Sequence, residues 1–352
     1  MTSLFAYVGC YTSPEREGEG KGINVYRVDR RSGAFEHVQL LAIENPSFLA
    51  FDPGGERLYA IHGGRSEASA FTVDRGSGRI ALLNRQLTGG FNPVHLAFDR
   101  SGRFLAVANY GSDSLAALPV GDDGSLGPYS TLTIVKGTQG PHRVQQRGMY
   151  PHHNPLDPGG RFFYVPCKGS DAVVAYRLDA RRGVLREAAR VASRPSAGPR
   201  HITFHPRKAL AWVINELDST LTTYRLDRAS GALKPLQTVP STPDSFTGYS
   251  TGAEIAVERT GRFLYVSNRG HDSIGVFAID AAKGTLSPVQ WVPSGGTVPR
   301  FFAFDPSGRF LYCANQGSHS ILAYRKGRDG QLAPAGVRIR VKSPACIVFS
   351  PS

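Results

Sequence analysis

Short apolar runs recur along the whole chain and are separated by residues that favour turns. Within the runs apolar residues alternate with polar or small ones, as in GINVYRVD and SLAALPV, and Gly, Pro, Asp and Ser stand between them. This alternation is typical of β-strands with one buried face, and no long helical period competes with it. The pattern therefore predicts an all-β protein built from many short strands.

The strand pattern forms an internal repeat with a period of 45 to 58 residues. Each copy contains an apolar strand, a turn of the form DPxGR, a strand of the form LYVxN, a strand of the form GxxSIxVYxxD and a strand after SGxL. The first strand ends at an apolar anchor residue, and the anchors are Phe51, Phe98, Leu156, Phe204, Val257, Phe304 and Phe349. Four strands at this period are typical of a propeller blade rather than of a helical repeat.

The two ends of the chain supply parts of the same repeat. Residues 5–41 contain three of the four strands, and residues 343–349 contain the missing leading strand. Joining these segments in one sheet closes the ring and removes the unpaired edge that an open array would expose. We therefore predict a seven-bladed β-propeller with four-stranded antiparallel blades, as a single domain over residues 1–352.

Composition agrees with this fold and narrows the functional classes. Hydrophobic residues make up 41% and charged residues 20% of the chain, with 40 Gly and 24 Pro, as expected for a soluble globule rich in turns. The first residues lack the basic and apolar segments of a secretion signal, and no apolar run is long enough to span a bilayer. We expect a cytoplasmic protein that does not bind membranes. The four cysteines are scattered without CxxC spacing, which argues against disulfides or a zinc site.

The formal charge of +13 favours anionic partners, because long-range fields concentrate opposite charge. The basic residues lie in separate turns and do not form a stripe with exposed aromatic residues; examples are Arg30, Arg31, Arg181 and Arg182. This distribution argues against nucleic acid as a partner and fits a small anionic metabolite.

Two positions of the repeat carry polar residues that differ between copies. The position four residues before each anchor holds Ser47, Val94, His152, Arg200, Ala253, Arg300 and Ala345. The position twelve residues after it, with Tyr11 assigned by its motif, holds Tyr11, Gly63, Tyr110, Lys168, Glu216, Arg269 and Gln316. Because the chain reverses between them, both positions are expected at the same end of each blade. Equivalent places in a structural repeat need similar residues, so charged residues that differ there are site candidates.

Arg200 and Glu216 form the sharpest candidate pair, because opposite charges fall on neighbouring strands of one blade. A purely structural ion pair stays an equal alternative for these two residues. Arg269 has a similar alternative, since its guanidinium could simply bridge two blades.

The histidines are divided by their place in the repeat. His152 and His153 are adjacent, and alternation along a strand points them to opposite faces, so joint metal ligation is not expected. His95 and His201 share a different repeat position, where packing within the strand is the more usual role. His152 is therefore the histidine expected to take part in chemistry.

Longer motifs resemble a known family, the bacterial seven-bladed lactonases that include the propeller-type 6-phosphogluconolactonases. The resemblance covers nearly the whole chain and rests on VGCYTS, KGINVYRVD, GPRHITFHP with WVINEL, AEIAVERTGRFLYVSNRG and PRFFAFDPSGRFLYCANQ. A fungal carboxymuconate cyclase is similar to this family as well. The resemblance implies a β-propeller and activity on a lactone.

The resemblance also implies a set of active-site residues. In similar proteins a His at the start of the fourth inner strand, the Arg of GPRH, the Glu of NEL and the Arg of SNRG line the proposed site. The matching catalytic candidates here are His152, Arg200, Glu216 and Arg269. Many relatives read PHxH before the fourth turn, and the first His of that motif is missing here, where residues 149–152 read MYPH.

These residues predict metal-independent hydrolysis of a sugar lactone, with 6-phosphogluconolactone or a related lactone as substrate. His152 would take a proton from water, Glu216 would orient that water or assist protonation of the ring oxygen, and the arginines would hold the oxyanion. Further substrate-binding candidates are Lys168, Arg300, Gln316 and Tyr110.

No GxSxG elbow is present, so direct attack by water is preferred to an acyl-enzyme, and no acidic cluster suggests a metal or another cofactor. A carboxymuconate-lactonising enzyme and a non-enzymatic interaction scaffold remain the alternatives.

Overall fold

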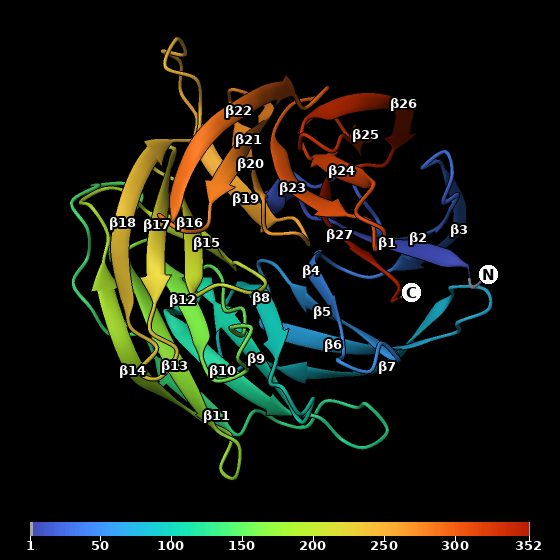
Figure 1. Cartoon of the computed structure of the whole chain (residues 1–352). Helices are drawn as coiled ribbons and strands as arrows, with labels where there is room; N and C mark the ends of the chain where they lie inside the picture. The colour runs from blue at the N-terminus through green and yellow to red at the C-terminus, as the bar shows by residue number, and fades with distance from the viewer. Residues whose placement is uncertain (1–2, 352) are drawn as a thin grey trace.

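Seven antiparallel sheets form a ring in the computed structural model, which describes residues 3–351 (Figure 1). Consecutive sheets along the chain are neighbours in the ring, and β27 lies beside β1, where the two termini meet. Their pairing aligns Ala6 with Phe349 and Val8 with Ile347, which closes the ring as predicted. The seven-bladed β-propeller is confirmed. The predicted domain also includes Met1, Thr2 and Ser352, which lie outside the described residues.

Three blades come from the two ends of the chain and its first hundred residues, and their strands are given from the innermost outward. Blade 1 contains β27 (Pro344–Phe349), β1 (Leu4–Cys10), β2 (Gly22–Val28) and β3 (Phe35–Ala42). Blade 2 contains β4 (Pro46–Phe51), β5 (Arg57–His62), β6 (Glu67–Val73) and β7 (Ile80–Leu87). Blade 3 contains β8 (Pro93–Phe98), β9 (Phe104–Asn109), β10 (Ser114–Pro119) and β11 (Thr131–Ile134).

The other four blades complete the ring. Blade 4 contains β12 (Phe163–Cys167), β13 (Ala172–Asp179) and β14 (Val184–Ala192). Blade 5 contains β15 (Pro199–Phe204), β16 (Leu210–Asn215), β17 (Thr220–Leu226) and β18 (Leu233–Pro240). Blade 6 contains β19 (Thr251–Val257), β20 (Phe263–Arg269), β21 (Ser273–Asp280) and β22 (Thr285–Pro293). Blade 7 contains β23 (Pro299–Phe304), β24 (Phe310–Asn315), β25 (Ser320–Lys326) and β26 (Leu332–Arg340). Two short 3₁₀ helices, η1 (Pro14–Arg16) and η2 (Tyr110–Ser112), follow the second-position strands of blades 1 and 3.

Blade 4 differs in its innermost segment, which carries His152. The segment follows the path of an inner strand but pairs only through two isolated bridges, Pro151 with Cys167 and Leu156 with Phe163. Proline has no N–H to donate to a ladder, and Pro151 and Pro155 both interrupt this segment. His152 therefore lies in a segment with fewer ladder pairs than the inner strands of the other blades.

Apolar cores fill the space between neighbouring blades rather than the interior of each blade. Within residues 3–351, seven clusters of buried residues each join side chains of two adjacent sheets, as Trp212 of blade 5 packs with Leu264 of blade 6. Burial of this apolar surface is the main force that holds the ring together. The four cysteines are buried free thiols within it, as expected from their scattered spacing.

Tyrosines of the LYV runs add a repeated polar contact between blades. Their hydroxyls donate to glycine carbonyls of the SGxL turn in the next blade, in the pairs Tyr7–Gly78, Tyr59–Gly124, Tyr164–Gly231, Tyr265–Gly330 and Tyr312–Gly33. These glycines have φ between 76° and 87°, a region that favours glycine. The LYV strand of one blade and the SGxL turn of the next are thus joined by a hydrogen bond at each of these interfaces.

A β-bulge occurs at the position four residues before the anchor. Arg200 lies between the pairs Pro199–Asn215 and His201–Ile214, so it has no partner of its own in the ladder. The same shift of register occurs at Ser47, Val94, Ala253, Arg300 and Ala345. A bulge bends the strand and re-aims its side chain, and it lets one scaffold present a different residue from each blade.

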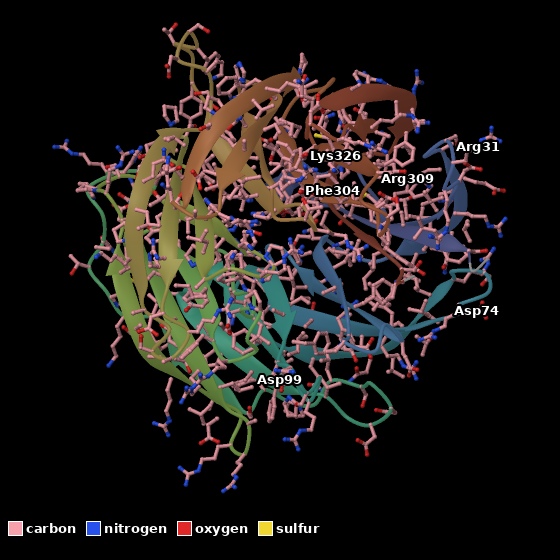
Figure 2. The ribbon with its side chains drawn as sticks, viewed as in Figure 1. Arg31, Asp74, Asp99, Phe304, Arg309 and Lys326 are labelled. Carbon is pink, nitrogen blue, oxygen red and sulfur yellow. The ribbon has the colours of Figure 1, made fainter. Side chains whose placement is uncertain are left out.

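Charged side chains are spread around the ring. Figure 2 shows Arg31 and Asp74 at its outline, and Arg309, whose Nη2 donates to the carbonyl of Arg30 at 2.6 Å, links blade 7 to blade 1. Lys326 makes a largely buried ion pair of 3.6 Å with Glu258 and links blades 6 and 7. Across residues 3–351, no helix has the length and apolar character that crossing a membrane requires.

Candidate active site

The two variable positions of the repeat lie opposite each other at one end of the ring. The N–H of the residue twelve after the anchor donates to the carbonyl two residues before the bulge, in the pairs Tyr110–Asn92, Lys168–Tyr150, Glu216–Gly198 and Gln316–Val298. This confirms the predicted arrangement. We call the side chains at these two positions, taken together, the axial site.

Glu216 is the centre of the best-ordered part of the axial site. Its Oε1 lies 2.9 Å from Lys168 Nζ, and its Oε2 lies 3.0 Å from Arg200 Nε and 3.3 Å from Arg269 Nη2. Blades 4, 5 and 6 therefore each contribute a cation to one carboxylate. Arg200, Lys168 and Glu216 are only 2%, 4% and 8% exposed. The structure thus brings together four residues that the repeat singled out.

The two arginines are also anchored on blade 6. Arg200 Nη1 donates to the carbonyl of Ala253 at 2.7 Å, and Arg269 Nη2 donates to the carbonyl of Gly252 at 3.0 Å. Arg269 joins blade 6 to blade 5 through its ion pair with Glu216, as one interpretation held, and belongs to the axial site as well. Each guanidinium thus contacts both the Glu216 carboxylate and a backbone carbonyl, which favours a preorganised electrostatic site.

The charges around Glu216 determine its protonation. Burial alone would raise the pKa of this carboxyl, but Arg269, Lys168 and Arg200 outweigh burial and hold the pKa far below its ordinary range. Burial, with Arg269 nearby, lowers the pKa of Arg200 to about 9, so its guanidinium remains charged at neutral pH. An ionised carboxylate with both oxygens in ion pairs is a poor proton donor. This geometry favours Glu216 as the residue that holds three cations in place.

His152 lies beside this cluster with an unused ring nitrogen. Its backbone N–H donates to the carbonyl of Pro166 at 2.9 Å, and its buried Nδ1 has no hydrogen-bond partner among the described residues. The ring centroid is 5.5 Å from that of Tyr110 and 5.2 Å from that of His201. Burial, then the charge of Arg200, holds the pKa of His152 well below its usual value. The imidazole is therefore neutral near pH 7 and able to accept a proton.

The remaining predicted residues line the same end of the ring. Tyr110 stacks on Tyr150 at 4.5 Å, and Lys168 Nζ lies 5.9 Å from the Tyr110 ring. The guanidinium of Arg300 lies 5.2 Å from the ring centroid of Tyr11. Gln316 is the last of the eight predicted site residues. Its Oε1 is buried without a hydrogen-bond partner in the described chain. All eight predicted residues belong to the axial site.

Comparison with known families decides what kind of propeller this is. A family model described as "Lactonase, 7-bladed beta-propeller" matches residues 5–349. The chain belongs to this lactonase family. This membership confirms the sequence prediction of a lactone-hydrolysing enzyme, in preference to a non-enzymatic scaffold.

Individual relatives of this lactonase match over almost the full chain. A 6-phosphogluconolactonase of Bacillus subtilis (strain 168) is 33% identical over 353 residues, which cover 99% of both chains. A 6-phosphogluconolactonase of Formosa agariphila is 34% identical, with 91% of this chain and 92% of that protein covered. The solved structure of a periplasmic gluconolactonase from Pseudomonas aeruginosa superposes with a TM-score of 0.90 at 31% identity, covering 99% of each chain.

A column of buried histidines lies next to His152 in this lactonase. His153 stacks on His201 at 4.2 Å, and its ring lies 3.9 Å from that of His95. Both His152 and His153 contact His201, so the strict alternation expected for a regular strand does not apply to this proline-interrupted segment. His95 and His201 pack within the core as predicted. Across residues 3–351, no group of three or more histidine, cysteine or acidic side chains is arranged to hold a metal ion.

Glu254 at the end of this column was not predicted. Its Oε1 lies 3.1 Å from His201 Nδ1, and burial raises its pKa to about 7. Gln145 was also missed, and its Oε1 accepts a hydrogen bond of 2.9 Å from Lys168. Glu254 immediately follows a recognised repeat position, whereas Gln145 lies in the insertion that lengthens one repeat to 58 residues. Of these two residues, only Glu254 could have been found from the sequence repeat.

Proposed function

We propose that this lactonase hydrolyses an anionic sugar lactone, with 6-phosphogluconolactone as the leading substrate, by direct attack of water and without a metal ion. The observation that carries the proposal is the charge of the axial site. Lys168, Arg200 and Arg269 share a single carboxylate, Glu216, and a fourth basic side chain, Arg300, lies over Tyr11. Largely buried charge without compensation is costly, so an anionic ligand fits this site.

The reaction begins with His152 as general base. Its neutral imidazole removes a proton from water while the water oxygen bonds to the carbonyl carbon of the lactone. The resulting oxyanion is stabilised by the guanidinium groups of Arg200 and Arg269, which Glu216 holds in position. Collapse then breaks the bond between the carbonyl carbon and the ring oxygen. The imidazolium returns its proton to that oxygen, which gives the open hydroxy acid.

The names of the relatives support the choice of substrate. Proteins called 6-phosphogluconolactonase match 99% and 91% of this chain, and both are more than 30% identical to it. A phosphorylated lactone supplies the negative charge that the axial site lacks. The cytoplasmic location expected from the sequence stays a prediction.

The test compares turnover of 6-phosphogluconolactone, uncharged gluconolactone and carboxymuconolactone by the purified protein in the presence of a chelator. We expect the phosphorylated lactone to have the highest kcat/KM. His152→Ala and Arg200→Ala should each lower kcat/KM by roughly 10²–10³-fold. Their melting temperatures should change little, because Glu216 keeps Lys168 and Arg269 as counter-charges without Arg200, and His152 Nδ1 has no hydrogen bond to lose. Full turnover in both variants, or complete loss of wild-type activity with chelator, would contradict the proposal.

A further inference from the structure

A second pair of cations, Arg300 of the axial site and the nearby Arg16, has no carboxylate partner among the described residues. Arg300 of blade 7 and Arg16 of η1 both lie over the ring of Tyr11, with guanidinium carbons 5.2 and 4.7 Å from its centroid. Arg16 Nη2 also donates to the Tyr11 hydroxyl at 2.9 Å. Among residues 3–351, no acidic side chain lies within ion-pair distance of either arginine. Neither arginine is therefore paired directly with a carboxylate, unlike the cations around Glu216.

Tyr11 organises this group. It is only 2% exposed, and burial would raise the pKa of its hydroxyl, but Arg300 and Arg16 together lower that pKa. A cation over an aromatic ring is held by the ring's quadrupole without being neutralised, so the guanidinium keeps its charge and its donors for a ligand. Stacking on tyrosine thus fixes the direction of both arginines.

Two unpaired polar atoms lie on blades 2 and 7, the blades on either side of the one that carries Tyr11. Ser47 Oγ of blade 2 and Gln316 Oε1 of blade 7 are buried without a hydrogen-bond partner in the described chain. Buried polar atoms without a partner are uncommon in folded proteins, because leaving such an atom unpaired costs free energy. A sugar with hydroxyl groups and an anionic substituent supplies both kinds of partner, since hydroxyls donate to Gln316 Oε1 and an oxyanion accepts from Ser47 Oγ.

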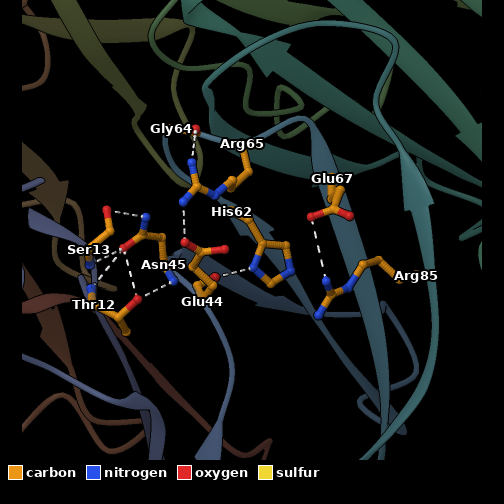
Figure 3. A network of polar contacts seen from close by, with 9 residues as sticks. All are labelled: Thr12, Ser13, Glu44, Asn45, His62, Gly64, Arg65, Glu67 and Arg85. Carbon is orange, nitrogen blue, oxygen red and sulfur yellow. Dashed lines mark hydrogen bonds and ion pairs between the residues drawn. The ribbon is translucent and has the colours of Figure 1, made fainter. Parts of the chain in front are cut away.

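The loop that carries Arg16 is fixed to blade 2. Asn45 Oδ1 accepts hydrogen bonds from the backbone N–H groups of Thr12 and Ser13, at 2.7 and 3.1 Å, and Asn45 Nδ2 donates to Ser13 Oγ at 2.9 Å (Figure 3). Gly63 contributes by having no side chain. A Cβ at this position would lie 3.0 Å from Ser47 Oγ and 3.1 Å from Tyr11 Cε1. These contacts preorganise the loop, which lowers the cost of binding a ligand.

We propose that Arg16 and Arg300, stacked on Tyr11, bind the anionic substituent of the lactone, a phosphoryl or carboxylate group, away from the reacting carbonyl. This inference rests on the proposed function. Guanidinium groups offer forked donors that match oxyanions, and Arg16 lies outside the propeller repeat, in a loop that can vary without disturbing the blades. This subsite gives the enzyme its preference for charged over neutral lactones.

The experiment measures kcat and KM of Arg16→Gln for 6-phosphogluconolactone, a carboxylated sugar lactone and neutral gluconolactone. Loss of a contact made equally in the ground and transition states raises KM and leaves kcat nearly unchanged. We expect KM for the phosphorylated lactone to rise about tenfold or more, which corresponds to one charge-assisted hydrogen bond. KM for the neutral lactone should stay within about twofold. The carboxylated lactone distinguishes recognition of phosphoryl groups from recognition of any oxyanion.

Arg65→Gln is the matched control. Arg65 lies in a neighbouring loop, and its guanidinium is already paired with Glu44 (Figure 3), so this variant removes the same charge without removing an unpaired donor. It should leave KM for all three lactones unchanged. Arg16→Lys should restore part of the affinity for the phosphorylated lactone, because it restores the charge without the fork.

A second measurement separates failure of this inference from failure of the proposed function. Inorganic phosphate should raise the melting temperature of the wild-type protein and of Arg65→Gln, and this shift should be lost in Arg16→Gln. If the wild type hydrolyses no lactone but phosphate still stabilises it through Arg16, the anion subsite stands and the proposed function falls. Equal changes in KM for charged and neutral lactones, or a phosphate effect that does not depend on Arg16, would overturn the subsite.

Discussion

The two ends of the blades use the same repeated scaffold in opposite ways. The turn end is the end of each blade that carries the DPxGR-type turn. There, a side-chain acceptor takes hydrogen bonds from backbone N–H groups of the same turn. Asp52, Asp99, Asp157 and Asp305 do so with carboxylates, and His205 and Glu258 take the same place in blades 5 and 6. At the axial site, by contrast, equivalent positions hold residues as different as His152, Arg200 and Ala345. Contacts that repeat support the fold, and residues that differ at equivalent positions are candidates for function.

The largest expected effect is at Glu216, which belongs to the axial site but should also stabilise the fold. Glu216→Gln leaves Lys168, Arg200 and Arg269 without their shared counter-charge. We expect a loss of about 3–5 kcal/mol in the free energy of unfolding, the usual cost of removing one member of a buried ionic cluster. The pKa of this carboxyl is lowered by folding, so its stabilisation is present above pH 4.5 and is lost as pH falls through the folded-state pKa.

Urea unfolding of Glu216→Gln at pH 7 measures this loss directly, with Arg200→Ala as the control. Arg200→Ala should cost less, because Glu216 then keeps two counter-charges, Lys168 and Arg269, whereas Glu216→Gln leaves three cations without their shared carboxylate. Equal stability of the wild type and Glu216→Gln would show that the carboxylate does not hold the cations together.

A smaller effect is expected at the turn end. The carboxylate of Asp99, which lies away from the centre of the ring in Figure 2, accepts hydrogen bonds from the N–H groups of Ser101 and Phe104 at 3.0 and 2.8 Å. Asp99→Ala leaves these groups unpaired and should lower the free energy of unfolding by about 1–3 kcal/mol. Its kcat/KM should match the wild type at a temperature where both are folded. A loss of activity without a loss of stability would reverse the proposed division between the two ends.

Much of the fold followed from the sequence because periodic features determine it. The anchors, the DPxGR-type turns and the strand motifs recur along the chain, and a recurrent pattern can be recognised in a single sequence. The axial site could be predicted for the same reason, because the repeated structure of the blade places Arg200 and Glu216.

The rest depends on tertiary contacts that have no period. Arg16 and Gln145 reach the axial site from η1 and from an insertion, and neither segment repeats. The number of cations around Glu216 could not be read from any one blade, because Lys168 and Arg269 come from the blades on either side of it. The proton-donor role considered for Glu216 lost its support for this reason.

The central claim is that a neutral His152 in the axial site activates water, and the pH dependence of kcat/KM for 6-phosphogluconolactone tests it most directly. Burial and Arg200 hold the pKa of His152 below 6.5, so protonation should stop the reaction only below that pH. The account predicts constant kcat/KM from pH 8 down past 6.5, an acid limb below it, and disappearance of this limb from the residual activity of His152→Ala. An acid limb above pH 6.5, or one that persists unchanged in His152→Ala, would contradict the account.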